Sequence, residues 1–166
     1  MSTLHQRDRL TEAVAMRESG QVDEARRLLL ELQAESPDDA IINLQCAWAH
    51  DKLGLEAEAV PFYETAIKRG LEDDNLRHAL LGLGSTYRTL GRYDDALVTL
   101  TRGVETFPDD RSMHVFRAMA LYNVGDSKEA CQVLLRVLSE TTADERIRSY
   151  RNAIDIYAAD LDRTWS

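Results

Sequence analysis

The residues best suited to acid–base or metal chemistry in this 166-residue chain are four histidines, two cysteines and several adjacent acidic pairs. The histidines are far apart in the sequence, and none belongs to an HExxH motif or to a Cys/His cluster with metal-ligand spacing. They are His5, His50, His78 and His114. No glycine-rich phosphate loop follows an apolar strand. We therefore predict no catalytic residue, no metal and no cofactor, and we predict that the protein is not an enzyme.

The acidic pairs are better explained by helix structure than by metal binding. Each pair stands where a helix is expected to begin, and a carboxylate there can accept hydrogen bonds from free backbone N–H groups and offset the helix dipole. The pairs are Asp38-Asp39, Asp73-Asp74, Asp94-Asp95 and Asp109-Asp110. We expect caps from Asp38 and Asp39, from Asp109 and Asp110, and from Ser127 or Asp126, together with Asp23 and one residue of 73–75.

The charge balance narrows the classes of partner. Lys and Arg number 20 against 29 Asp and Glu, which gives a formal net charge of −9. A nucleic-acid binder needs a basic face to neutralise phosphates, and an anionic membrane surface makes the same demand. We therefore predict no nucleic-acid and no membrane partner. The negative charge favours solubility, and a preference for basic partners is the alternative.

Two features indicate a cytoplasmic location. The first ten residues, MSTLHQRDRL, lack the apolar core of a signal peptide, and no apolar run approaches the length of a membrane span. Cys46 and Cys131 are expected on the inward sides of their helices, as small buried residues and not as a disulfide, which fits a reducing compartment.

Four glycines mark an internal repeat. Gly20, Gly54, Gly91 and Gly125 are separated by 34, 37 and 34 residues. The same residue types recur around each glycine: a small residue seven before it, an alanine five after it and a large side chain nine after it. In that order these are Ala13, Ala47, Gly84 and Ala118; Ala25, Ala59, Ala96 and Ala130; Leu29, Tyr63, Leu100 and Leu134. Small residues let helix backbones approach closely, so the pattern predicts four helix–turn–helix pairs.

This pattern resembles the tetratricopeptide repeat, and the third copy matches best, with Leu83-Gly84, Tyr87, Ala96 and Phe107-Pro108. The second half, with ALYNVG at 120–125 and the run at 134–162, is also similar to a family of small stand-alone bacterial tetratricopeptide-repeat proteins. The resemblance implies an all-α superhelix, or solenoid, that binds protein or peptide partners. It also implies a homodimer, because members of that family are thought to dimerise.

We predict a single domain over 1–166. Its repeats cover about 6–39, 40–73, 77–110 and 111–144, and a capping helix follows at about 144–162. Tyr150, Ala153, Ile154 and Tyr157 share one face of that helix, which we expect to point inward, whereas Asp155 should point away. Pro61 should make the fourth helix start late, near Glu58, or bend.

The resemblance also locates a candidate binding surface. In this repeat type the first helix of each pair lines the concave face, at ten, six and three residues before the turn glycine. These positions hold Leu10, Leu44, Leu81 and Val115; Val14, Trp48, Ser85 and Met119; Arg17, Asp51, Arg88 and Tyr122. Two of the three rows are mostly apolar. We expect a groove that receives an amphipathic helix of a partner, with Trp48 as its hot spot.

Three alternatives remain open from the sequence. A second copy of the chain can cover the groove or the end helices, with Trp165 contributing to the interface. The groove side chains can instead pack against one another. An acidic secretion-type chaperone shares the length, charge and repeat type, and nothing in the sequence selects it.

Overall fold

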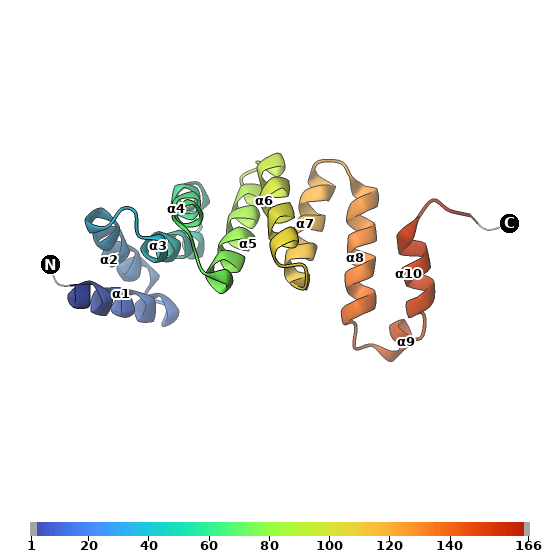
Figure 1. The fold of residues 1–166 in the computed structure, drawn as a ribbon, viewed down its shortest axis with the longest axis horizontal. Helices are drawn as coiled ribbons and strands as arrows, with labels where there is room; N and C mark the ends of the chain where they lie inside the picture. The colour runs from blue at the N-terminus through green and yellow to red at the C-terminus, as the bar shows by residue number, and fades with distance from the viewer. Residues whose placement is uncertain (1–2, 165–166) are drawn as a thin grey trace. The chain divides into compact units, whose positions relative to one another are not determined.

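The computed structural model describes residues 3–164, and within this range the regular structure is entirely helical. The expected all-α class is confirmed. The chain divides into two compact units, residues 1–92 and 93–166, which we treat separately (Figure 1).

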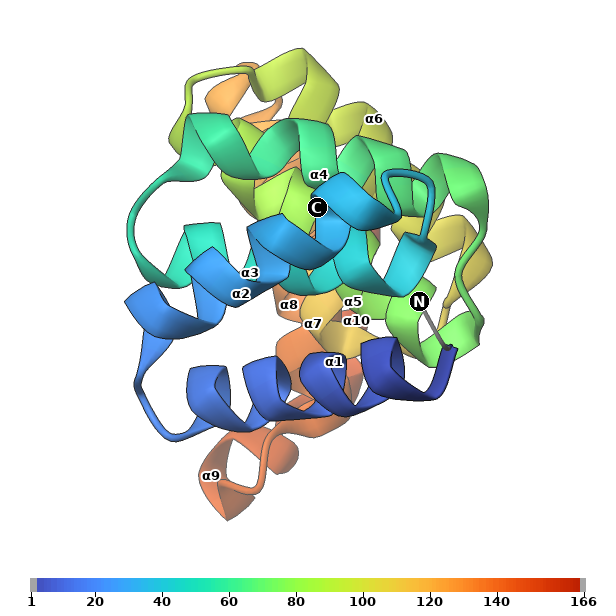
Figure 2. The same cartoon turned by 90° about the vertical axis from the view of Figure 1, so that its left-hand side faces the viewer.

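The described residues of the first unit form five helices, and each of the first two pairs packs as a hairpin (Figures 1 and 2). They are α1 (Thr3–Glu18), α2 (Val22–Glu35), α3 (Ala40–Lys52), α4 (Glu56–Arg69) and α5 (Asp73–Thr89). Helix α2 also packs on α3, and α4 packs on α5. One apolar core is shared by α1, α2 and α3, with Ala13, Leu29 and Cys46 among its fully buried members.

The second unit contains the remaining helices. They are α6 (Tyr93–Thr106), α7 (Arg111–Asn123), α8 (Ser127–Thr141), α9 (Glu145–Arg148) and α10 (Arg151–Ala159). Helix α7 packs between α6 and α8, and α10 packs on α8. Leu121 of α7 and Val133 of α8 belong to the core of this unit.

The turn glycines and the small residues behave as the repeat pattern predicts. The φ angles of Gly20, Gly54, Gly91 and Gly125 are 91°, 70°, 75° and 94°, in the region that side-chain-bearing residues rarely adopt. All eight small residues of the pattern are buried, so the helices meet at these points.

The capping predictions are confirmed at three positions and wrong at the others. The carboxylates of Asp39, Asp110 and Asp126 accept hydrogen bonds from the first backbone N–H groups of α3, α7 and α8. Helix α2 instead begins after Gln21, and α5 begins after Glu72, in both cases with no side-chain cap. The acidic residues expected to cap these two helices lie inside the first turn, where they still offset the helix dipole.

The late start expected for the helix that contains Pro61 is wrong. Helix α4 begins at Glu56, two residues before the expected start at Glu58, and it continues past Pro61 to Arg69. Proline removes one backbone hydrogen bond inside a helix. The extensive packing of α4 against α3 and α5 compensates for that loss.

The continuous last helix expected over 144–162 is also wrong. The segment is broken into α9, which Asp144 caps and which ends at Arg148, and α10, which begins after Tyr150. The expected inward face is wrong too: Tyr150 is 68% exposed and Tyr157 is 52% exposed. Asp155, expected to point away, accepts a hydrogen bond from Ser139 of α8 at 2.6 Å.

The two cysteines differ from each other. Cys46 is buried as expected, whereas Cys131 is exposed, so the prediction for Cys131 is wrong. Cys131 is exposed although both α7 and α10 pack on α8.

Two glycines inside helices provide a test of helix spacing. A Cβ atom added at Gly82 comes within 2.4 Å of the Tyr63 hydroxyl oxygen, and one added at Gly103 comes within 2.5 Å of the Met113 sulfur. A tyrosine ring is rigid and a methionine side chain is flexible. We expect Gly82→Ala to lower the free energy of unfolding by about 1–3 kcal/mol.

Gly103→Ala serves as the matched control, and we expect it to cost less than about 1 kcal/mol because Met113 can move. Urea unfolding followed by circular dichroism measures both. Equal losses for the two variants would mean that the Tyr63 ring does not set the spacing between α4 and α5.

Candidate partner-binding site

Nine of the twelve expected groove residues lie in the first unit, on the first helix of each pair. They are Leu10, Val14 and Arg17 on α1; Leu44, Trp48 and Asp51 on α3; Leu81, Ser85 and Arg88 on α5. Helix α3 contacts both α1 and α5, so these three helices form one continuous row. The other three residues lie on α7 of the second unit, and we describe them separately.

Trp48 is the centre of the row in the first unit. Its ring is partly exposed. The Arg17 guanidinium carbon lies 5.3 Å from the ring centroid, and the His78 ring meets the indole edge-on at 6.1 Å with an interplanar angle of 82°. Arg17 from α1 and His78 from α5 therefore hold the indole of α3 between them.

Arg17 is itself fixed by its neighbours. Its Nε donates to the buried Gln45 side chain at 3.2 Å, and its side chain is only 12% exposed. Lys52 donates to the Arg17 backbone carbonyl at 3.3 Å. A cation over an indole ring contributes roughly 0.5–2 kcal/mol, more when it is desolvated. Contacts within the chain therefore fix the position of the cation relative to the ring.

The Asp51 side chain is hydrogen-bonded to other side chains of the first unit. Its carboxylate accepts a hydrogen bond from the Tyr63 hydroxyl at 2.6 Å and from the Thr86 hydroxyl at 3.1 Å. These bonds join α3 to α4 and α5. Burial raises the pKa of the Asp51 carboxyl, and the two hydroxyl donors oppose that shift. Burial also raises the pKa of Tyr63.

The remaining expected residues of the first unit differ in accessibility. Leu44 is fully buried, so a partner cannot touch it without opening the core. The others are partly buried: Leu10, Val14, Leu81, Ser85 and Arg88. The accessible surface is therefore narrower than the three rows of the sequence predict.

Sequence reasoning missed His78 and Gln45 as members of this site. His78 lies one helical turn before Leu81, so extending the groove rows by one turn finds it. Gln45 is polar and only 8% exposed, and its residue type alone does not predict that it is buried.

In the second unit, the expected residues on α7 are more accessible. Tyr122 is 67% exposed and Met119 is 36% exposed, whereas Val115 is partly buried. They follow one another at helical spacing and give α7 an apolar exposed stripe.

Two of the histidines considered for catalysis or metal binding lie beside backbone carbonyl groups. His50 is buried and its Nδ1 lies 2.7 Å from the Cys46 carbonyl oxygen, and His114 Nε2 lies 2.9 Å from the Pro108 carbonyl oxygen. Across residues 3–164, no three His, Cys, Asp or Glu side chains are grouped so that they could hold a metal ion.

An open hollow at the start of α5 is lined by Glu72 and residues 73–75.

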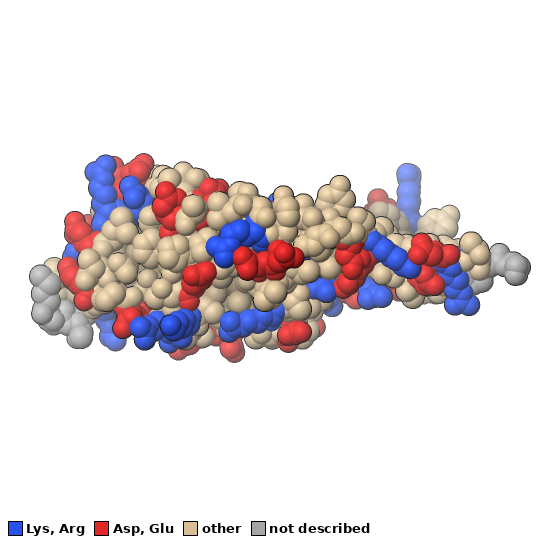
Figure 3. Space-filling view, turned by 90° about the horizontal axis from the view of Figure 1, so that it is seen from above, with Lys and Arg blue, Asp and Glu red and all other residues tan. Residues whose placement is uncertain are grey.

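Positive and negative side chains are interspersed on the face drawn in Figure 3, which lacks a single large basic area. Within the described part of the chain, every helix is too short or too polar to cross a lipid bilayer.

Comparison with known proteins identifies the repeat. A family model described as "Tetratrico peptide repeat" matches residues 40–161, and a second, "Tetratricopeptide repeat", matches residues 9–31. Among curated proteins, Superkiller protein 3 of Saccharomyces cerevisiae is 22% identical over 116 residues. That match covers 66% of this chain but only 8% of the yeast protein.

Solved structures show the same fold at low identity. The crystal structure of YrrB, described as a TPR protein with an unusual peptide-binding site, has a TM-score of 0.72 at 19% identity. The match covers 93% of this chain and 77% of YrrB. A crystal structure of MamA has a TM-score of 0.72 at 14% identity, covering 97% of this chain and 79% of MamA.

We expect Asp51→Asn to change how stability depends on pH. Because burial raises the pKa of Asp51, the folded chain holds this proton more tightly than the unfolded chain does. The stabilising contribution is therefore present at low pH and is lost as the pH rises through the folded pKa. Asparagine does not titrate, so the free energy of unfolding of the variant, relative to the parent, should increase from about pH 3 to about pH 7.

Urea unfolding at several pH values measures this difference. Asp8→Asn, on the exposed face of α1, controls for the loss of one negative charge. A relative stability that falls as the pH rises would show that the hydroxyl donors, and not burial, dominate the environment of Asp51.

Proposed function

Because the chain belongs to the tetratricopeptide repeat family, whose fold generally mediates protein–protein interaction, we propose that it is a non-enzymatic scaffold that binds a protein segment. The binding surface is the inner row of the first unit, centred on Trp48. The partner is an amphipathic helix or peptide that places an apolar side chain against the indole. We place the protein in the cytoplasm, with no nucleic-acid and no membrane partner.

The observation that supports this site is the preorganised indole. Trp48 is held by Arg17 at 5.3 Å and by His78 at 6.1 Å, yet its ring stays partly exposed. An aromatic ring fixed in advance loses little side-chain entropy on binding, and tryptophan is enriched among residues that dominate interface energy. YrrB, which has the same fold, is described as having a peptide-binding site, and this supports a peptide ligand here as well.

Self-association is the second candidate. Exposed apolar side chains are concentrated in the second unit, where Tyr122, Tyr150 and Ile156 are each more than half exposed. A homodimer that covers such residues would use the second unit for assembly and leave the first unit for a partner.

The groove is tested by Trp48→Ala. The protein and its variant are used as baits in the cytoplasm of the source cell, and captured proteins are quantified by mass spectrometry. We expect the specific partner to be lost or reduced by at least about tenfold, because removal of a hot-spot residue costs about 2 kcal/mol or more.

Val98→Ala is the matched control, because Val98 is 71% exposed on α6 and lies outside the groove. It should capture the same partner as the parent chain. Equal capture by Trp48→Ala and the parent would exclude the groove, provided that circular dichroism shows both to be folded.

A further inference from the structure

The charge balance of the inner row in the first unit is the reverse of that of the whole chain. The chain has 29 Asp and Glu against 20 Lys and Arg. Among the nine groove residues of the first unit, the ionisable ones are two arginines and one aspartate: Arg17, Arg88 and Asp51. Lys52, at the end of α3, directly follows Asp51 and is exposed. The row is therefore a locally basic surface on an acidic chain.

Lys52 contacts Arg17, the residue whose guanidinium faces Trp48. The Lys52 ammonium donates to the Arg17 backbone carbonyl at 3.3 Å, so a cation of α3 lies at the last turn of α1. Lys52 is four residues after Trp48, which places both side chains on one side of α3. The guanidinium carbon of Arg17 lies 5.3 Å from the indole centroid. We call Arg17 and Lys52 the cation pair.

The cation pair keeps hydrogen-bond donors that the chain does not use. Within residues 3–164, Lys52 forms no ion pair with a carboxylate. Arg17 has one carboxylate contact, from Nη2 to Glu18 at 3.4 Å, and the Glu18 side chain is 66% exposed. Its Nε donates to Gln45, whereas its Nη1 donates to no group in the described part of the chain. An arginine has five N–H donors, so donors remain for an oxygen ligand.

Asp51, the carboxylate of the row, does not neutralise the cation pair. One of its oxygens accepts from the Tyr63 hydroxyl at 2.6 Å, and the other accepts from the Thr86 hydroxyl at 3.1 Å. Among the described residues it forms no ion pair with Arg17 or Lys52. The excess positive charge beside Trp48 is therefore not cancelled by the carboxylate next to it in the sequence.

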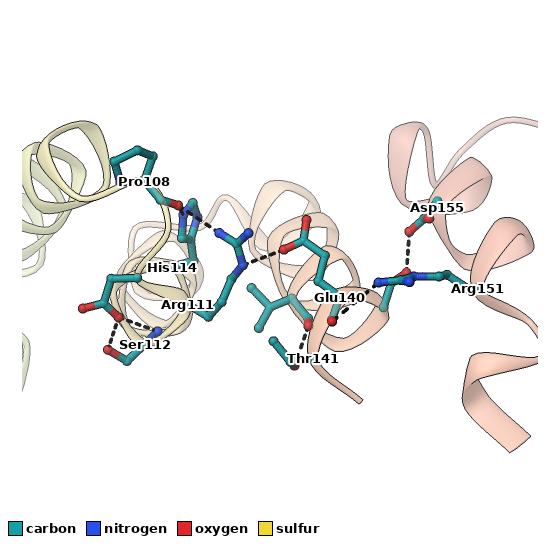
Figure 4. A network of polar contacts seen from close by, with 11 residues as sticks. Pro108, Arg111, Ser112, His114, Glu140, Thr141, Arg151 and Asp155 are labelled. Carbon is teal, nitrogen blue, oxygen red and sulfur yellow. Dashed lines mark hydrogen bonds and ion pairs between the residues drawn. The ribbon is translucent and has the colours of Figure 1, made fainter. Parts of the chain in front are cut away.

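Two cations of the second unit show the contrasting arrangement. Arg111 Nε lies 2.6 Å from the Glu140 carboxylate, and Figure 4 shows this ion pair between α7 and α8. The Lys128 ammonium lies 2.6 Å from the Asp162 carboxylate. These two charges are neutralised within the chain, whereas the charge of Lys52 is left for a ligand.

We propose that the segment bound by the Trp48 groove is acidic: it places an Asp or Glu carboxylate on the cation pair and an apolar side chain on the indole. This inference rests on the proposed function, because it names the chemistry of the segment that the groove binds. Hydrogen bonds from Arg and Lys to a carboxylate are stronger than neutral ones. In a helical segment the two side chains are three or four residues apart, because that spacing puts them on one side of the helix.

The net charge of −9 favours a basic partner only over long distances. At physiological ionic strength, charges more than about 8 Å apart are largely screened. A side chain bound beside Trp48 therefore responds chiefly to the charges it touches, which are Arg17 and Lys52, with Glu18 as a competing carboxylate. A basic segment would bring like charges together at this point, which is unfavourable.

The test begins with a selection from a random peptide library displayed on phage, with the intact chain as bait. The peptides are about 16 residues long, which is enough for roughly four helical turns. We expect the enriched peptides to combine an aromatic or aliphatic residue with an Asp or Glu within about one turn of it. The most enriched peptide is then labelled with fluorescein, and its dissociation constant is measured by anisotropy. Replacing its acidic residue by lysine should raise that constant by at least about fivefold.

Lys52→Glu tests the cation pair from the side of the protein. It should raise the dissociation constant of the acidic peptide by at least about fivefold and abolish the preference for an acid over lysine. Lys68→Glu makes the same charge change at an exposed site on α4, outside the row, and should bind the peptide like the parent. High salt should reduce the preference, because the contact is ionic. Circular dichroism establishes that each variant is folded.

The outcomes separate the acidic segment from the groove itself. Enriched peptides that need Trp48 but lack Asp and Glu, or a lysine-substituted peptide that binds as tightly, overturn the acidic segment and leave the groove in place. Equal losses for Lys52→Glu and Lys68→Glu exclude the cation pair as the carboxylate contact. Peptides that bind Trp48→Ala as tightly as the parent, or no enrichment above beads without bait, contradict the groove of the proposed function.

Discussion

Close contact between helices at small side chains is the constraint on which this structure depends. Residues such as Ala13, Ala47 and Ala118 are almost fully buried and let neighbouring helices approach. At Gly82 the approach is so close that the Tyr63 ring occupies the space of a methyl group. Because each pair buries only part of its apolar surface, the core of the first unit is shared by three helices, and every pair relies on its neighbours.

The candidate binding surface of the first unit depends on the same packing. Leu44 of the inner row of the first unit is fully buried, whereas Trp48 of the same row is partly exposed. Its position is set by Arg17 and His78, which come from the helices on either side. Asp51 of α3 accepts a hydrogen bond from Thr86 of α5, and this bond joins two of the helices that carry the row.

The sequence predicts features that follow from one residue type at one position. The turn glycines, the buried alanines and the caps at Asp39 and Asp110 are of this kind, because backbone conformation or a single hydrogen bond decides them. The candidate site is predicted less completely. Trp48 is found by its place in the repeat, whereas the role of Gln45 depends on which side chain of another helix lies beside it.

The last segment shows why the helix pattern alone is not sufficient. Tyr150, Ile154 and Tyr157 have the spacing of a core face, yet polar anchors such as the Asp144 cap and the Asp155–Ser139 bond turn the segment another way. Amphipathic spacing identifies an apolar face, but competing hydrogen bonds decide which neighbour it meets. The prediction for Cys131 also fails: its thiol is exposed, although it was expected on the inward side of its helix.

The two thiols differ in burial, so a thiol reagent in solution should modify Cys131 and not Cys46. Burial raises the pKa of Cys46 to about 12, and its sulfur lies 3.5 Å from the Leu29 carbonyl oxygen, so electrophiles have neither access nor a thiolate to attack there. Cys131 is open to solvent on α8. A maleimide dye should therefore attach at one known point of the native sequence and report fluorescence changes at the carboxyl-terminal end of the repeats without any engineered cysteine.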